Sequence, residues 1–471
     1  MTIPGFGSAS APRGWGLALS VSLLLAACGG GSDSAPPPGD GSATTLSAAA
    51  QLGQKIFNDV ALSVSGTQSC ASCHVTASAF AEDASASGVD HGSPVPLGGA
   101  GMNQSGFRNT PSLMYASLIP AFYIDSDGGP NGGFFRDGRA ATLADQAVLP
   151  FTTSFEMGNA DAGAVIARLR TRPYFADFQT LYGSAVLADP ATALARMGQA
   201  VAAFESENPV FHPFSSKYDF FQKGQVQLSA QELRGLALFN NATKGNCSAC
   251  HPSTSGDGAT PPMFTDFSYD NLGIPRNSLI PANAASAPDG TPVNSDDGIQ
   301  TYYDLGVCGP FREQTVDFFS NCGQFKVPTL RNIAVTAPYF HNGRFTTLKD
   351  AIGFYVRRDT NPEEWYPINA DGTVTKFDDL PAIYGGQFVV TPGVVGSDAG
   401  YLGNVNTSEI PYNRVIGDTP ALSPDEIDDV ITFLCTLTDG FDPANPNVQA
   451  LPAQCQAAAH VAAAPNNSKS R

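Results

Sequence analysis

Positive charge is scarce in this chain. The 471 residues include 25 lysines and arginines against 43 aspartates and glutamates, so the formal net charge at pH 7 is −18. A surface this acidic repels nucleic acid, which argues against a nucleic-acid partner. The partners that remain are a basic patch on another protein or a small molecule.

The N-terminus lacks a hydrophobic run long enough to remain in a bilayer. The apolar run Trp15–Ala27 follows Arg13, is too short for a stable span and leads into the sequence LAAC, which ends at Cys28. This pattern predicts a lipoprotein signal peptide at residues 1–27, followed by a lipid-bearing Cys28 and a flexible tether at residues 28–45. We therefore expect a periplasmic protein with a lipid anchor in the outer membrane. The alternative is ordinary secretion, with Cys28 incidental.

Two Cys-x-x-Cys-His pentapeptides carry most of the chemical information. In an exported protein this pattern attaches c-type haem: the thiols add to the vinyl groups and the histidine becomes the proximal iron ligand. Half of a zinc knuckle has the same Cys-x-x-Cys spacing, but neither pentapeptide has a second ligand pair within roughly twenty residues. The predicted ligands of two covalently bound haems are Cys70, Cys73, His74, Cys247, Cys250 and His251.

Four further cysteines remain after Cys28 and the haem thiols are set aside. An even number of cysteines in an oxidising compartment predicts disulfides. Three pairings are possible, and we favour the one local in sequence, Cys308 with Cys322 and Cys435 with Cys455. Such bonds would staple loops.

The chain also contains a weak internal repeat. LGQKIFND at residues 52–59 precedes the first pentapeptide, and RGLALFNN at 234–241 precedes the second, with Gly and Phe at the same separation. Each segment predicts a helix. Ser229 and Glu232 form a capping-box pattern that fixes the start of the second helix.

Each half also predicts a closing helix, one at residues 189–205 and one that begins after Ser423. Each half therefore contains a helix, a haem loop and a closing helix, and this repeated order predicts a mainly α fold. We expect two cytochrome c-like haem domains with long Gly/Pro-rich loops, at residues 46–210 and 211–442, and a C-terminal tail at 443–471.

Three sequence blocks resemble signature segments of the bacterial di-haem cytochrome c peroxidase and MauG family. They are FRNTPSL from Phe107, FFRDGRAATLADQAVLPFTTSFEM from Phe134 and FKVPTLRNIAVTAPYFHNGRFTTL from Phe325. The resemblance implies an oxidoreductase that uses hydrogen peroxide at the N-terminal haem. It would oxidise a small redox protein or a residue of a partner protein, while the second haem stores or relays charge.

The resemblance assigns residues to the peroxide site on the first haem. Glu156 matches the family's distal glutamate, which moves a proton between the peroxide oxygens. Gln146 and Pro150 match two further pocket positions. A poorly solvated pocket can raise the pKa of a carboxyl group toward this task. Without the resemblance, Glu156 is a solvated carboxylate near a turn.

The second haem has a different predicted ligand set. Counting from Thr336, the family's ligand position is occupied by Tyr355, as in MauG, where simple peroxidases have methionine. Tyrosinate favours ferric and higher-valent iron, whereas methionine raises the potential. The alternative is that Tyr355 is a half-buried aromatic on a helix that begins near Thr347.

Other positions carry further expectations from the resemblance. Asn109, Thr336 and Pro338 match a calcium site between the haems. His341 matches a histidine near the second haem, and Arg331 could pair with a propionate. Taken alone, Asn109 is a turn residue and His341 could equally be structural.

Two residues depart from the family pattern. Arg136 stands where the family has a tryptophan between the haems, and Trp365 does not match that position. This puts fast charge sharing in doubt. His91 lies farther before Asn109 than the family's blocking histidine, so we expect the first haem to be open; the alternative for His91 is an exposed loop residue.

Two hypotheses from other classes remain open. One is a non-catalytic di-haem electron-transfer cytochrome c, and the other is a haem-based sensor tethered to the membrane. A pure carrier has no use for a distal acid and amide opposite an open iron. Glu156 and Gln146 therefore discriminate between a carrier and an enzyme.

Overall fold

Helices dominate the part of the chain that the computed structural model describes, and strands are few and short. The described residues are 45–82, 94–256, 258–280, 283, 303–309, 311–312, 319–447 and 449–459. The predicted signal, Cys28, most of the tether and His91 lie outside them. Among the described residues, no helix is both long and apolar enough to cross a membrane.

The elements are arranged in chain order as follows. The α-helices are α1 (Ala48–Phe57), α2 (Cys70–Cys73), α3 (Leu143–Thr152), α4 (Ala162–Leu169), α5 (Phe175–Tyr182), α6 (Pro190–Glu207), α7 (Lys217–Gln222), α8 (Ala230–Asn240), α10 (Leu348–Arg357), α11 (Pro424–Cys435) and α12 (Ala453–Ala458). Four antiparallel two-stranded ribbons pair β1 (Leu97–Gly98) with β2 (Gln104–Ser105), β3 (Tyr123–Ile124) with β4 (Pro130–Asn131), β5 (Tyr269–Asp270) with β6 (Phe325–Lys326), and β7 (Val374–Lys376) with β8 (Phe388–Val390). A mainly α fold is therefore confirmed.

Side-chain caps set the starts of the helices that frame the two halves. The hydroxyl of Ser229 accepts a hydrogen bond from the backbone N–H of Glu232, whose carboxylate accepts one from the N–H of Ser229. The same capping box, at Ser423, opens α11. These caps satisfy N–H groups that a helix start leaves unpaired. Both predicted helix starts are confirmed.

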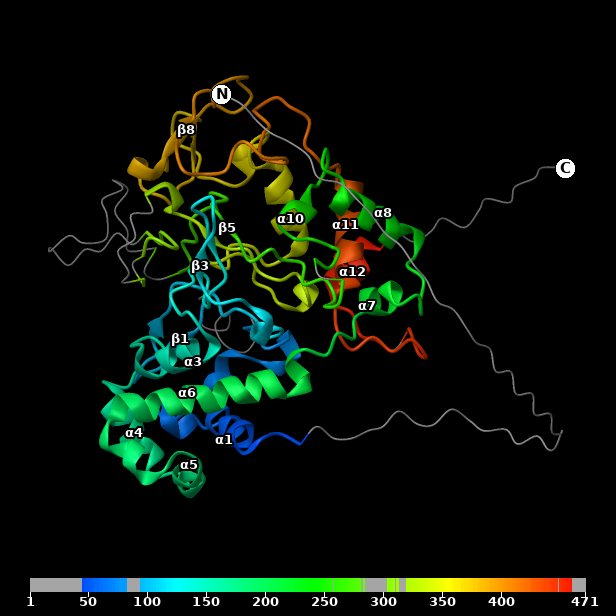
Figure 1. Cartoon of the computed structure of the whole chain (residues 1–471). Coiled ribbons are helices and arrows are strands. Elements are labelled where there is room, and N and C mark those ends of the chain that lie inside the picture. Colours follow the sequence, from blue (N-terminus) through cyan, green and yellow to red (C-terminus); the bar gives the residue numbers. More distant parts are fainter. Residues whose placement is uncertain are drawn as a thin grey trace, which may run out of the picture. The chain divides into compact units, whose positions relative to one another are not determined.

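A glycine allows close helix crossing in each half. Helix α1 packs along α6, and α8 packs along α11 (Figure 1). A Cβ atom on Gly53 would collide with the backbone of Ala200, and one on Gly235 would collide with the backbone of Asp429. The repeated glycine in the sequence is therefore explained by backbone contact at each crossing.

Aromatic pairs repeat beside these crossings. The ring centroids of Phe57 and Phe204 lie 5.5 Å apart, and those of Phe239 and Phe433 lie 5.2 Å apart, both edge to face. This geometry aligns α6 with α11 residue by residue. It equates Glu205 in the first half with Leu434 in the second.

A second set of repeats involves the turns that precede α3 and α10. Phe134 forms a β-bridge with Ala140, and Tyr339 forms the equivalent bridge with Phe345. The turns lead into α3 and α10, whose first residues, Leu143 and Leu348, are also 205 positions apart. The helix predicted to begin near Thr347 is thus observed. The alignment of these turns and helices equates Arg136 with His341 and Pro150 with Tyr355.

The two halves exchange backbone hydrogen bonds across these turns. The N–H of Asn109 donates to the carbonyl of His341 at 2.9 Å, and the N–H of Lys326 donates to the carbonyl of Arg136 at 2.8 Å. Each half therefore holds the turn of the other half.

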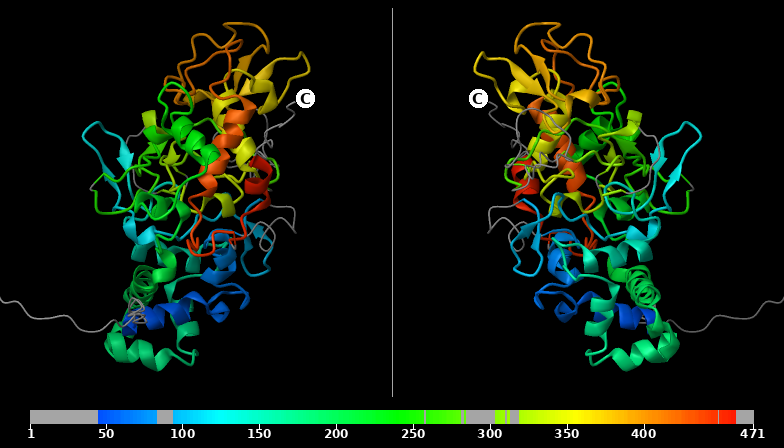
Figure 2. Two further views of the ribbon diagram at one scale, coloured as in Figure 1. Left: turned by 90° about the vertical axis from the view of Figure 1, so that its right-hand side faces the viewer. Right: turned by 90° about the vertical axis from the view of Figure 1, so that its left-hand side faces the viewer.

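The two larger hydrophobic cores of the described residues lie within residues 50–211 and 218–458, and a small third cluster contains Ala116, Phe134, Ala140 and Leu143. Figure 2 shows the helices of the first half, in blue to green, gathered at one end, and α10 and α11 at the other. Both cores belong to one compact unit, Thr44–Arg471. The domain boundary at residue 210 stays a proposal.

Disulfides close two loops of the second half. Cys308 bonds to Cys322, and Cys435 bonds to Cys455. The pairing favoured from the sequence is confirmed. Both bonds join segments near in sequence, and Cys435 ties α11 to α12.

Candidate functional site

The two pentapeptide histidines are oriented in the same way. The Nδ1 atom of His74 lies 2.9 Å from the carbonyl oxygen of Phe80, and the Nδ1 atom of His251 lies 2.8 Å from that of Phe264. A carbonyl oxygen only accepts, so each Nδ1 carries the proton and each Nε2 keeps its lone pair for a metal ion.

The protonation state of the two histidines also favours metal binding. Burial lowers the pKa of His74 to about 4 and the pKa of His251 below its ordinary value. Both imidazoles are therefore neutral at pH 7, the form that binds a metal.

The four pentapeptide thiols are uncommitted to disulfides and lie in the same two cavities. They are Cys70, Cys73, Cys247 and Cys250. Burial raises the pKa of each to about 12, so the thiols are protonated at pH 7. Two free thiols beside one oriented imidazole, twice, fit two c-type haems.

The first cavity, of about 130 Å³, collects the residues predicted for the peroxide site. His74 and its thiols come from α2 and the residue after it. Gln146 and Pro150 come from α3, and Glu156 comes from the turn that follows α3. The structure therefore brings together side chains that are up to 86 positions apart in sequence, from Cys70 to Glu156.

Glu156 sits in a poorly solvated part of this cavity. Burial raises the pKa of its carboxyl group, while Arg139 and a hydrogen bond to Thr153 act in the opposite direction. Arg139 is itself paired with Asp137, at 3.0 Å, which divides its charge between two carboxylates. Glu156 is therefore more easily protonated than an ordinary glutamate, as an acid and base near neutral pH must be.

A second acid in the first cavity was missed in the sequence. Glu205, near the end of α6, is 2% exposed, and its Oε2 atom has no hydrogen-bond partner among the described residues. Burial raises its pKa to about 8. Its spacing from Met197 and Val201, both on the apolar face of α6, could have revealed it as a buried acid.

The second cavity, of about 310 Å³, surrounds the second pentapeptide. Tyr355 on α10 lines it together with His251. Burial raises the pKa of the Tyr355 phenol above its ordinary value, and a metal ion would be needed to deprotonate it at pH 7. The ring of Tyr412 lies 6.0 Å from that of Tyr355.

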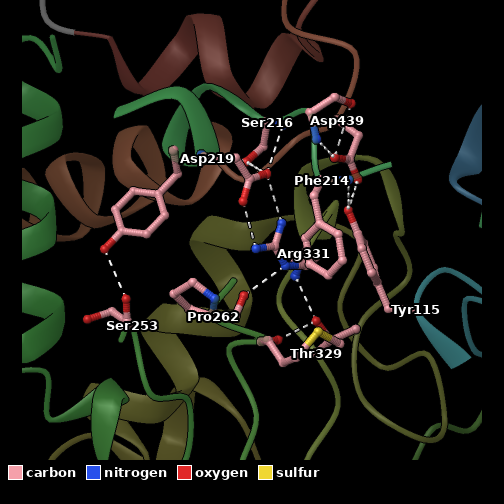
Figure 3. A network of polar contacts seen from close by, with 12 residues as sticks. Tyr115, Phe214, Ser216, Asp219, Ser253, Pro262, Thr329, Arg331 and Asp439 are labelled. Atoms are coloured by element: carbon pink, nitrogen blue, oxygen red, sulfur yellow. Dashed lines mark hydrogen bonds and ion pairs between the residues drawn. The ribbon is translucent and has the colours of Figure 1, made fainter. Parts of the chain in front are cut away.

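Arg331 lines the second cavity but has a carboxylate partner within the chain. Its guanidinium donates to both carboxylate oxygens of Asp219, at 3.0 and 2.9 Å, and to the carbonyl of Pro262 (Figure 3). Both charged side chains are 2% exposed. The bidentate contact predicted for a propionate is thus made by Asp219, and a role toward haem stays a prediction.

His341 also lines the second cavity. Its ring stacks on Phe325 with centroids 3.7 Å apart, and its Nε2 atom has no hydrogen-bond partner among the described residues. The nearest acid is Asp379, with 3.7 Å between the His341 Nε2 and a carboxylate oxygen. The imidazole is therefore fixed by stacking, with one nitrogen available to a group in the cavity.

The two cavities meet at a junction. The residues that line both are Thr110, Pro111, Leu113, Phe135, Arg136 and Gln146. Arg136 thus lies at the position expected for a bridging side chain. Trp365 lies elsewhere, packed against Phe345 and Phe354 in the core of the second half.

The residues predicted to bind calcium lie beside the junction, Asn109 in the first cavity and Thr336 and Pro338 in the second, but they do not fit a calcium site. The side-chain and backbone oxygens of Asn109 both accept hydrogen bonds from Arg136, and its amide nitrogen donates to the carbonyl of Pro338 at 2.6 Å. The hydroxyl of Thr336 points to its own turn, toward the carbonyl of Ile333. Among the described residues, no group of three or more His, Cys, Asp or Glu side chains could hold a metal ion.

Comparisons with known proteins agree with this arrangement. A family model described as di-haem cytochrome c peroxidase matches residues 47–227. The methylamine utilization protein MauG of Paracoccus denitrificans is 39% identical over 309 residues, which cover 65% of this chain and 74% of that protein. Cytochrome c551 peroxidase of Pseudomonas aeruginosa is 28% identical over 304 residues, which cover 64% of this chain and 70% of that protein. The crystal structure of the di-haem peroxidase BthA from Burkholderia thailandensis aligns at a TM-score of 0.69 and 35% identity, covering 86% of this chain and 90% of that one.

Proposed function

Since the chain belongs to the di-haem cytochrome c peroxidase and MauG family, and is therefore a peroxidase with two c-type haems, we propose that hydrogen peroxide reacts in the cavity of His74. The observation that carries this proposal is the position shared by Pro150 and Tyr355. At one place in the repeated scaffold the second cavity has a phenol, and the first cavity has a proline with no metal-binding atom.

The first half supplies the groups for proton transfer. The haem iron, when bound, supplies the electrons that reduce peroxide. Glu156 would take a proton from one peroxide oxygen and return it to the other, which leaves as water. Gln146, on the α3 face toward the same cavity, would orient the peroxide by hydrogen bonding.

The second half would store or relay oxidising charge. His251 and Tyr355 would hold the iron of the second haem, and His341 would bind a propionate of that haem. The protein domains would be residues 46–210 and 211–442. The protein would lie in the periplasm, held by a lipid anchor at Cys28. There it would oxidise a small redox protein or a residue on a partner protein.

The rate of the peroxide reaction tests the role of Glu156. In the holoprotein, Glu156→Gln should slow the change of the first haem's Soret band after peroxide addition by about 10²-fold or more, because the acid and base are lost. Glu363→Gln, an exposed change on η10 (Pro362–Glu364), is the control and should react like the wild type.

Two other results would contradict the proposal. An unchanged rate in Glu156→Gln would remove this side chain from the mechanism. A wild-type holoprotein that passes electrons but leaves peroxide unreacted would support the non-catalytic carrier.

A further inference from the structure

Three hydrogen bonds hold Arg136 in place at the junction. Its Nε atom donates to the backbone oxygen of Asn109 at 3.3 Å, and its Nη2 atom donates to the side-chain oxygen of the same residue. Its own carbonyl accepts from the N–H of Lys326 in the second half. One guanidinium thus engages both acceptor oxygens of one asparagine.

The amide of Asn109 is oriented by complementary partners. Its oxygen faces the Arg136 guanidinium, a pure donor, and its nitrogen faces the Pro338 carbonyl, a pure acceptor. The flipped amide would place donor against donor and acceptor against acceptor. A calcium ion would need the Asn109 and Pro338 oxygens to point at one centre, and the observed orientation turns only the nitrogen toward Pro338.

The junction already carries positive charge. Burial and the neighbouring Arg108 lower the pKa of Arg136 to about 10, which still leaves it charged at pH 7. Burial and the charge of Arg136 lower the pKa of Lys326 to about 7. The buried acids Glu82 and Asp304 act on Arg136 in the opposite direction. A divalent cation bound to the Asn109 side-chain oxygen would lie next to the positively charged guanidinium of Arg136, which contacts the same oxygen.

We propose that Arg136 takes the place of a calcium ion at the junction between the two cavities. The guanidinium supplies the fixed positive charge and positions Asn109 between Pro338 and His341, so the holoprotein holds no calcium there. Arg136 is a positioning residue in this role: it acts through Asn109, which binds the turn of the second half. The inference does not rest on the reaction proposed above.

The direct test is the calcium content of haem-loaded full chain, combined with thermal unfolding in calcium and in EGTA. For the wild type we expect less than stoichiometric calcium and the same Tm in both solutions. In Arg136→Gln, the Asn109 oxygens are released, and we expect about one calcium per chain and a Tm that calcium raises by several degrees. Arg136→Lys keeps the charge and should remain calcium-free.

A matched control is available three residues away. Arg139→Gln removes the same charge from the same turn, but Arg139 pairs with Asp137 and not with Asn109. We expect it to gain no calcium. Calcium binding by both Gln variants would show a general effect of charge and would overturn the positioning role.

The remaining outcomes also decide the inference. Stoichiometric calcium in the wild type, or a Tm that falls in EGTA, overturns it. If Arg136→Gln folds but binds no calcium, the claim that the guanidinium replaces a calcium ion is overturned. Should Arg136→Gln fail to fold, isothermal titration of wild type and Arg136→Lys with calcium decides: no binding by either supports the inference, and binding by the wild type overturns it.

Discussion

The two halves of this protein use the same scaffold to build two different cavities. Each half orients its histidine through a carbonyl, at Phe80 and at Phe264, and each crosses its helices at a glycine. The differences fall on side chains at equivalent positions. The comparison teaches that side chains at equivalent positions of a repeated scaffold can give two cavities different chemistry.

Two matched positions carry the difference. Pro150 and Tyr355 occupy the same place in α3 and α10, and decide whether a phenol faces the cavity. Glu205 and Leu434 occupy the same place in α6 and α11, and both line their cavities. At these two positions the first cavity has a proline and an acid, whereas the second has a phenol and an apolar side chain.

Making the first half like the second should give the largest effect. Pro150→Tyr places a phenol in the first cavity, where it can bind the iron as Tyr355 is proposed to do. We expect the peroxide reaction to slow by more than the ~10²-fold expected from loss of acid-base catalysis alone. Stopped-flow spectroscopy of the holoprotein checks this.

Pro150→Ala is the control for that exchange, because it removes the proline without adding a ligand. It should keep an open first haem. Equal loss of rate in both variants would show that the proline itself, and not an added ligand, decides the reactivity.

Making the second half like the first should change only the second haem. Tyr355→Phe removes the phenol oxygen, and we expect the spectrum of the second haem to lose the signature of tyrosinate while that of the first is unchanged. Tyr412→Phe, 6.0 Å away in the same cavity, is the control and should leave both spectra unchanged. Identical spectra for wild type and Tyr355→Phe would exclude Tyr355 as a ligand.

The repeated glycines should respond alike. Gly53→Ala and Gly235→Ala each force a Cβ atom into a backbone carbonyl, and we expect each to lower the free energy of unfolding by roughly 2–4 kcal/mol. Urea titration measures the loss. Gly256→Ala, where a Cβ meets no atom within 4 Å, should have little effect. If only one of the two variants lowered the free energy of unfolding, the two helix crossings would not be equivalent.

A pH-dependent effect on stability should come from the buried acid. The folded-state pKa of Glu205, about 8, exceeds its ordinary value of 4.5, so the folded state binds this proton more tightly than the unfolded state. Its contribution to stability is complete below pH 4.5 and is lost as the pH rises to about 8. Glu205→Leu introduces the residue that α11 has at this position. The urea midpoint of this variant should depend less on pH between pH 4.5 and about 8 than that of the wild type. An unchanged pH dependence would contradict the assignment.

Much of the scaffold was predictable because its signals are local. The pentapeptides, the capping box at Ser229 and the pairing of Cys308 with Cys322 each depend on residues close in sequence. The expected start of the α10 helix at Thr347 follows from its cap. The candidate site residues were gathered by resemblance, and the structure places Glu156, Gln146 and Pro150 in one cavity.

The rest depends on contacts that spacing does not encode. The partner of Arg331 is Asp219, 112 positions away. The orientation of Asn109 depends on Arg136 and Pro338, which come from different halves. Glu205 continues the apolar face of α6 from Met197 and Val201, but helical spacing alone does not show that a cavity lies beside it.

The most direct test of the account is one spectrum of the diferric holoprotein, taken before and after hydrogen peroxide. We predict one open, high-spin haem and one six-coordinate haem, with peroxide changing the absorption within the dead time of mixing or shortly after it. Two six-coordinate haems and an absorption that peroxide leaves unchanged would contradict the account.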